Sequence, residues 1–234
     1  AEGKSGDKST YQIEVSIPAG VWKSFQMETM LHKSMKQNGP GRNTDNANPN
    51  FVLTEMIVKV EGASKPLEFM RVFADFNQGG FLPGQLFDGN LETRNGWAIA
   101  PEFGKAHWVK AEFSEPLELG KDSKLQIEMK HLYGGGRNVG RPRFSLSTDG
   151  IKKGLADNER LNELLAKEKR NGKEEKELRA IFDQENPKLL ALQKKVGDLE
   201  KSLKQVTPPT TLVMVEMDEK RETHVMARGS YLSP

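Results

Sequence analysis

"FVLTEMIVKV" (Phe51–Val60) carries the strongest structural signal in this chain. Its apolar residues recur at every second position, which is the pattern of a β-strand with one buried face. The alternation changes phase once, near Glu55. We therefore expect strands on both sides of Glu55, separated by a β-bulge or by a change of sheet partner.

Short alternating runs of the same kind lie on both sides of this stretch. They are "YQIEVSI", "LEFMRVFADF", "HWVKAEF", "KLQIEMKHLY" and "RFSLST". Gly, Pro and Asn separate the runs. Many short alternating segments with turn residues between them favour an antiparallel β-sandwich over a parallel sheet with crossover helices. The sequence therefore predicts a mainly β domain over residues 8–150.

The composition changes near Gly150, and residues 151–206 predict helices. Apolar residues recur there at spacings of three and four. The clearest set is Leu189, Leu192, Val196, Leu199 and Leu203. Asn186 and Pro187 supply an N-cap and a first-turn proline for this helix. Leu161–Leu165 and Leu178–Phe182 give matching apolar groups on one or two earlier helices, separated by the break "RNGK", so we expect a helical hairpin packed on itself or on the sandwich.

The last part of the chain, residues 207–234, predicts a β-hairpin. "VTPPTT" ends the helix, because proline cannot continue it. "TLVMVEM" and "THVMARG" then flank the polar turn "DEKRE". We expect this hairpin to lead into the next domain of a longer protein.

Composition excludes several classes of function. The 234 residues include 35 basic and 33 acidic ones, a formal net charge of +2, which does not indicate nucleic acid as a partner. No apolar run approaches about 18 residues, the length of a membrane-spanning helix. The absence of cysteine excludes disulfides, thiol catalysis and thioether-linked haem within the chain.

No arrangement of residues predicts catalysis. The chain has no Gly-X-Ser-X-Gly turn, no phosphate-binding loop, and no local carboxylate pair of the kind that separates two pKa values. Its four histidines are far apart in sequence and form no metal-ligand spacing. We expect a protein that is not an enzyme.

The loop "LFDGNLETRNGW" (Leu86–Trp97) has two interpretations. Calcium prefers carboxylate, amide and backbone oxygens, which Asp88, Asn90 and Thr93 could partly supply. The same residue types also form ordinary turns by capping their own backbone. The loop therefore predicts either a structural calcium site or a turn.

A sugar site needs aromatic faces and amide or guanidinium donors. The candidate residues are Trp97, Trp108, Tyr133, Arg137, Arg141, Arg42 and Asn43. Tryptophans of a sandwich are also common in its core, and the glycines after Tyr133 suit either an open ligand loop or a simple hairpin end.

Several separated motifs resemble one family. They are "NGPGRN", "NFVLTEMIV", "GWAIAPEFGKAHWVKAEF", "GRPRFSLST" and "PPTTLVMVEMDEKRETHVMARGSYLSP". In this order they are similar to the central part of large planctomycete surface proteins that combine a cytochrome c-like domain with two planctomycete-specific domains of unknown function. The resemblance implies a galactose-binding-like, discoidin-like jelly roll followed by helices, and a closing hairpin that opens the last of those domains. It also implies export to the periplasm or cell surface.

The resemblance bears on both candidate sites. Discoidin-like modules often hold a structural calcium ion where Asp-Gly-Asp/Asn precedes Thr and Trp, and "DGNLETRNGW" is similar, although Arg94–Gly96 lengthen it before Trp97. The haem signature Cys-X-X-Cys-His is absent, so no haem is expected here.

Two functions follow as hypotheses. The first is a non-catalytic carbohydrate-binding module of a larger exported protein, for a polysaccharide that bears acidic groups. The alternative is a structural or interaction spacer whose helical hairpin docks flanking domains. An exposed, coplanar pair of aromatic side chains at a loop end would favour the first, and burial of all three tryptophans the second.

Overall fold

The structure is a computed structural model that describes residues 6–35, 37, 39–42, 49–151, 159–206 and 218–219. The chain divides into two compact units, Ala1–Gly197 and Asp198–Pro234. This division falls inside the last helix and not at the limits 150 and 206 that the sequence predicted. The predicted C-terminal hairpin, residues 207–234, lies outside the described residues apart from Asp218 and Glu219.

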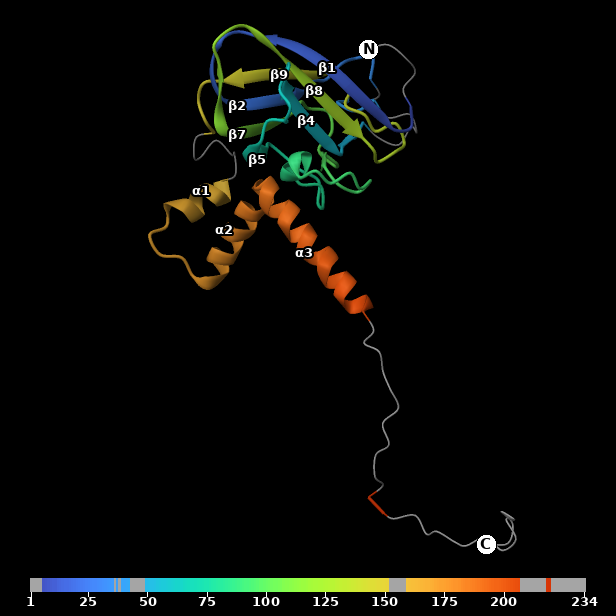
Figure 1. The fold of residues 1–234 in the computed structure, drawn as a ribbon, viewed down its shortest axis with the longest axis vertical. Coiled ribbons are helices and arrows are strands. Elements are labelled where there is room, and N and C mark those ends of the chain that lie inside the picture. Colours follow the sequence, from blue (N-terminus) through green and yellow to red (C-terminus); the bar gives the residue numbers. More distant parts are fainter. Residues whose placement is uncertain are drawn as a thin grey trace, which may run out of the picture. The chain divides into compact units, whose positions relative to one another are not determined.

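The first unit is mainly β, with antiparallel sheets and a few helices (Figure 1). Sheet A contains, in spatial order, β1 (Ser9–Ile17), β8 (Ser123–His131) and β4 (Glu55–Val60). Sheet B contains β5 (Phe69–Ala74), β7 (His107–Leu119), β2 (Gly20–Thr29) and β9 (Pro142–Ser147). A third, short pair joins β3 (Val52–Leu53) to β6 (Trp97–Ala98).

The phase change near Glu55 is a change of sheet partner, as predicted. β3 pairs with β6, whereas β4 pairs with β8. Thr54 lies between the two strands, and its hydroxyl accepts a hydrogen bond from the Leu132 N–H at 3.0 Å. Gly96 allows the close approach of the short pair, because a Cβ there would lie 2.0 Å from the Leu53 carbonyl oxygen. The sequence pattern therefore located the point where the chain leaves one sheet for another.

The core is one cluster that contains alternate residues from the strands of sheets A and B. On β7 the side chains of His107, Val109, Ala111 and Phe113 are buried, while their neighbours are more exposed. β8 contributes Leu125, Ile127 and Met129 to the same cluster. Each large apolar side chain contributes about 1.5–3 kcal/mol when fully buried. This core dominates the stability of the fold.

Three helices follow the sheets: α1 (Glu159–Ala166), α2 (Gly172–Glu185) and α3 (Pro187–Gln205). A 3-10 turn, η2 (Pro83–Phe87), lies earlier in the chain. The Asn171 side chain accepts hydrogen bonds from the Lys173 and Glu174 N–H groups, which caps α2. The predicted start of α3 is confirmed, because Asn186 Oδ1 accepts from the Leu189 N–H and Pro187 is its first residue.

The predicted burial of the apolar seam in a helical hairpin is wrong. The side chains of Leu192, Val196, Leu199 and Leu203 are 55–72% exposed. Only Asn186 separates α2 from α3, whereas an antiparallel helix pair needs a connection of about two to five residues. The chain therefore cannot fold α3 back along α2. Among the described residues, no helix has the length and apolar character that a membrane span requires.

Candidate functional site

The loop "DGNLET" closes on itself. Asp88 Oδ1 accepts hydrogen bonds from the Asn90 N–H at 2.8 Å and from Asn95 Nδ2 at 3.1 Å. Asn90 Oδ1 accepts from the Glu92 N–H at 3.0 Å. These are the bonds of side chains that cap their own turn. Asp88 and Asn90 are thus brought together as predicted, whereas Thr93 is exposed.

A lysine from α3 places its positive charge on this loop. Lys194 Nζ lies 2.6 Å from Asn90 Oδ1 and 3.1 Å from Glu92 Oε1. The ammonium therefore contacts one of the candidate calcium ligands, Asn90 Oδ1. No group of three or more His, Cys, Asp or Glu side chains within the described part of the chain could hold a metal. The hydrogen bonds of Asp88 and Asn90 are those of the turn interpretation.

A buried carboxyl lies next to the loop and was not singled out from the sequence. Glu55, at the start of β4, is 5% exposed. Its Oε1 accepts a hydrogen bond from the Gly89 N–H at 3.3 Å, and its Oε2 has no partner. Burial and the nearby Asp88 charge raise the pKa of Glu55 to about 9. Burial also raises the pKa of Asp88.

Glu55 and Asp88 therefore form a carboxyl pair in which Glu55 is protonated at neutral pH. Such a pair can release a proton or accept a cation. The phase change of the alternation was the signal that could have revealed it, because it puts Glu55 among buried positions. Nothing in the sequence connects Glu55 to a loop 33 residues later (88 minus 55).

Gly41 and Arg42, which begin one Gly-Arg-Asn segment, meet the second such segment, residues 136–138, and its neighbour Val139. The Arg42 N–H donates to the Asn138 carbonyl at 2.8 Å, and Gly41 forms a bridge with Val139. The Arg137 guanidinium lies 5.2 Å from the Tyr133 ring centre. The structure thus brings together the predicted residues Arg42, Tyr133 and Arg137.

Two other predicted residues are less well placed. Arg141 is exposed, and its carbonyl accepts a hydrogen bond from the Met30 N–H at 2.9 Å. Asn43 lies outside the described residues.

The glycine loop beside Tyr133 binds a side chain of its own chain. Gly134, Gly135 and Gly136 all have positive φ. The Gly135 N–H donates to Asp7 Oδ1 at 2.6 Å, and the Gly136 N–H donates to the Asp7 carbonyl at 3.0 Å. Asp7 thus holds the loop that could have been open to a ligand. The three glycines serve the fold.

The predicted role of Trp97 as a sugar platform is wrong. Its side chain is fully buried, and its Nε1 donates to the Phe76 carbonyl at 2.8 Å. Its ring meets the Phe51 ring edge-on, with centres 5.0 Å apart. Trp108 is half-buried on β7, and Lys110 Nζ lies 4.9 Å from its ring centre. A lysine therefore already contacts the second predicted platform.

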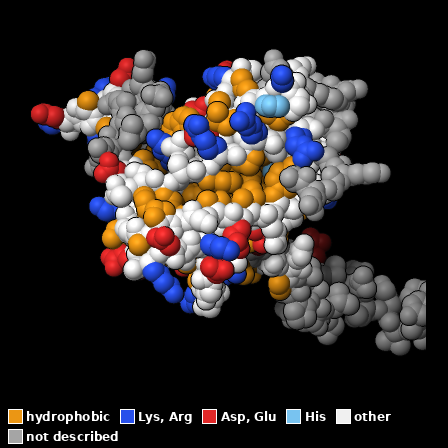
Figure 2. Space-filling view, turned by 90° about the horizontal axis from the view of Figure 1, so that it is seen from above, with side chains coloured by type: hydrophobic (Ala, Val, Ile, Leu, Met, Phe, Trp, Pro, Cys, Tyr) orange, Lys and Arg blue, Asp and Glu red, His pale blue; other side chains and the backbone are white. Residues whose placement is uncertain are grey.

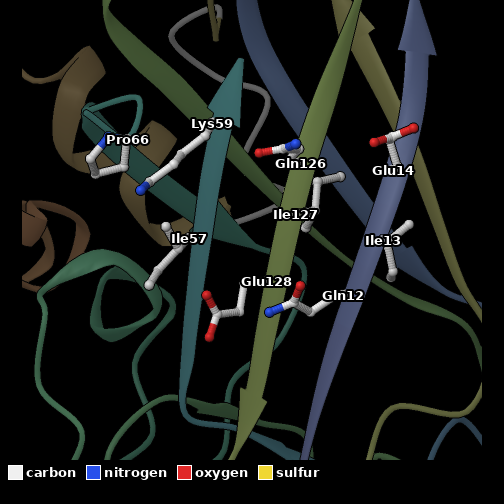
Figure 3. A pocket seen from close by; sticks show the side chains of 9 residues that line it. All are labelled: Gln12, Ile13, Glu14, Ile57, Lys59, Pro66, Gln126, Ile127 and Glu128. Atoms are coloured by element: carbon white, nitrogen blue, oxygen red, sulfur yellow. The ribbon is translucent and has the colours of Figure 1, made fainter. Parts of the chain in front are cut away.

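The outer face of sheet A forms a hollow of about 550 Å³ (Figure 3). Its lining residues come mostly from three adjacent strands and are Gln12, Ile13, Glu14, Ile57, Lys59, Pro66, Gln126, Ile127 and Glu128. Gln126 on β8 lies opposite Glu14 of β1 and Lys59 of β4 in the strand register. Glu128 lies opposite Gln12 and Ile57 in the next row. We call this surface the sheet A hollow.

A second hollow is apolar. It measures about 200 Å³ and lies between β1 and β9, the edge strands of the two sheets. Val15, Ile17, Trp22, Phe144 and Leu146 are among its lining residues. Figure 2, which looks onto the upper side of Figure 1, shows hydrophobic side chains gathered in a depression bordered by lysine and arginine.

The two buried histidines are structural. His107 lies between Asp75 Oδ2, at 2.9 Å from Nδ1, and the Glu102 carbonyl oxygen, at 2.6 Å from Nε2. His131 Nε2 accepts a hydrogen bond from the Val139 N–H, and burial lowers the pKa of this imidazole to about 4. Both rings are buried, and both nitrogens of His107 and Nε2 of His131 connect parts of the fold.

Comparison of the chain with models of protein families, with curated proteins and with solved structures found no match. The resemblance to planctomycete surface proteins therefore stays a prediction, and the site is interpreted from its own chemistry.

Proposed function

We propose that the chain is a non-catalytic carbohydrate-binding module of a larger exported protein. In this proposal its two sheets form a β-sandwich of the jelly-roll, galactose-binding-like type. The sheet A hollow is the observation that carries the proposal. It gathers two amides, two carboxylates and an ammonium group on one open face, together with the apolar surfaces of Ile57 and Pro66.

These groups match the chemistry of a sugar. A sugar hydroxyl both donates and accepts hydrogen bonds, and the amides of Gln12 and Gln126 do the same. Glu128 accepts and Lys59 donates. The strands are hydrogen-bonded to one another, so the backbones that carry these side chains are ordered before a ligand arrives. Pre-organisation of this kind lowers the cost of binding.

A second surface suits the acidic groups of a polysaccharide. Arg42 and Arg141 are exposed near the contact between Gly41 and Val139. Guanidinium groups pair in a bidentate way with carboxylate or sulfate, and salt screens such pairs at exposed positions. Binding at the sheet A hollow should be insensitive to salt, whereas binding at these arginines should weaken with salt.

Calorimetric titration against neutral and sulfated glycans at two ionic strengths tests the proposal. Gln126→Ala and Glu128→Ala should weaken the binding of neutral glycans. Gln26→Ala, which changes the same residue type on sheet B, is the matched control and should leave binding unchanged. Arg42→Ala and Arg141→Ala should remove only the salt-sensitive part. If no glycan binds at millimolar concentration in either salt, the carbohydrate function is withdrawn.

The structural or interaction spacer remains the second candidate function. The exposed apolar seam on α3 favours it, because apolar residues at regular spacing on an exposed helix face suit contact with another chain or domain. In this proposal, α3 contacts flanking domains of the parent protein.

A further inference from the structure

The two faces of α3 differ in their contacts. One face contacts the loops of the first unit, where Lys194 bonds to Asn90 and a Leu190 methyl lies against Gly84. The opposite face carries Leu192, Val196 and Leu199, which are all more than half exposed. Docking through the first face therefore does not cover the second, although the second is the more apolar.

The exposed face follows a coiled-coil heptad. Its residues are Leu189, which is half-buried, and the exposed Leu192, Val196, Leu199 and Leu203, and they are spaced alternately by three and four. In heptad notation Leu189, Val196 and Leu203 take position a, and Leu192 and Leu199 take position d. In the central heptad the β-branched Val196 at a lies between leucines at d, the combination that favours two parallel strands. We call this set the α3 seam.

The charges beside the seam are complementary between two copies of the chain. Lys195 takes position g and Glu200 takes position e, and both are exposed. In a parallel pair, a g residue faces the e residue five positions later in the other helix, and such pairs set partner choice and orientation. Lys195 of each copy would then face Glu200 of the other. In an antiparallel pair, g faces g and e faces e, so Lys195 would face Ser202 and Glu200 would face Gln193, and the pairing of opposite charges would be lost.

We propose that two copies of this chain associate through a parallel, two-stranded coiled coil formed by the α3 seam. This interface does not depend on glycan binding. The seam spans 14 steps from Leu189 to Leu203 (203 minus 189), or roughly 21 Å at 1.5 Å per residue. A coiled coil this short is weak, so association depends on concentration.

Sedimentation equilibrium of the full chain over a range of concentrations tests the association. The mass should rise from 26.2 kDa towards twice that value. Leu199→Glu should keep the mass at that of one chain. Lys195→Glu and Glu200→Lys should each weaken association by about tenfold or more, and the double exchange should restore it. Far-ultraviolet circular dichroism of each variant shows whether the sheets remain folded.

Single cysteines test the parallel orientation, because the chain has none of its own. Leu192→Cys and Leu203→Cys lie near opposite ends of the seam. In the parallel pair, each variant forms a disulfide with its own copy under mild oxidation. In an antiparallel pair, only a mixture of the two variants does so. Lys201→Cys lies on the outer face of the coiled coil and is the control that should not cross-link.

Three results would overturn the proposal. The first is a single-chain mass at every concentration with a Leu192→Cys thiol that reacts freely with maleimide, which means that the seam is open. The second is the same mass with a protected thiol, which means that another part of the same chain covers the seam. The third is cross-linking only in the mixture, which means that the pair is antiparallel.

Discussion

The sheets and helix α3 differ in what they do with apolar residues of equally regular spacing. The alternating residues of β4, β7 and β8 are buried in the core. Four heptad residues of α3, Leu192, Val196, Leu199 and Leu203, are 55–72% exposed. The backbone N–H and C=O groups of a strand form their hydrogen bonds with neighbouring strands, so a strand requires a partner in the fold. A helix forms these hydrogen bonds within itself. Periodicity therefore predicts an apolar face in both regions, but it predicts a buried face only in the sheets.

A substitution in the core between the strands should have the largest effect on the free energy of unfolding. Trp97→Ala removes a fully buried ring and its hydrogen bond to Phe76. We expect a loss of about 3–5 kcal/mol in the free energy of unfolding, measured by urea denaturation. Trp108→Ala, at a half-buried position, is the matched control and should cost less. A smaller loss at Trp97 than at Trp108 would contradict the burial of Trp97.

The buried carboxyl of Glu55 should make stability depend on pH. Its pKa is raised from 4.5 to about 9 by burial and by Asp88, so the folded state holds the proton more tightly than the unfolded state. Its contribution is complete below pH 4.5 and is lost as the pH rises towards 9. The slope is at most about 1.4 kcal/mol per pH unit for one proton. Glu55→Gln keeps the shape and should remove this slope from unfolding curves recorded between pH 5 and 8.

His131 should act in the opposite direction. Burial lowers the pKa of its ring from 6.5 to about 4, so the folded state resists protonation. Its contribution is complete above pH 6.5 and is lost as the pH falls towards 4. Between pH 4.5 and 6.5 the two groups oppose each other, so His131→Gln should reduce the loss of stability towards low pH and Glu55→Gln should increase it. An unchanged loss of stability towards low pH in the His131 variant would show that other groups cause it.

The sequence predicted local features better than contacts between residues that are far apart along the chain. The change of partner near Glu55 and the start of α3 at Pro187 are encoded by neighbouring residues, and both predictions are confirmed. The contact between Lys194 and Asn90 joins residues 104 positions apart. A local pattern contains no information about such a contact.

The same limit explains the errors. Tryptophan serves both as a core residue and as a sugar platform, so the residue type could not decide between the two roles of Trp97. The apolar seam of α3 was predicted to be buried, and this is wrong because the single residue Asn186 is too short a connection to fold α3 back along α2. The exact helix ends were needed to see this.

Substitution at the contact between α3 and the loop "DGNLET" should lower the free energy of unfolding by a moderate amount. Lys194→Met removes the hydrogen bond to Asn90 Oδ1 and should cost about 0.5–1.5 kcal/mol in the free energy of unfolding. Lys188→Met, at an exposed ion pair with Glu68, is the control and should cost less. A chelator should leave the melting temperature of the unmodified chain unchanged. A fall with chelator would instead support a calcium ion at Asp88, Asn90 and Thr93, because a bound ion stabilises the folded state.

The smallest effect should come from the α3 seam in dilute solution, where the chain is a single copy. A buried seam would make Leu199→Ala cost about 2–4 kcal/mol, and this is the value that a packed hairpin requires. Since Leu199 is 61% exposed, we expect a change below about 0.5 kcal/mol in the free energy of unfolding. Val109→Ala, at a buried position of β7, provides the contrast within the same chain and should cost more. Repeating the Leu199 measurement at high concentration should increase its cost, because association through the seam then adds to the stability of the folded state. If the free-energy cost of Leu199→Ala does not change with concentration, the exposed seam has no role in pairing.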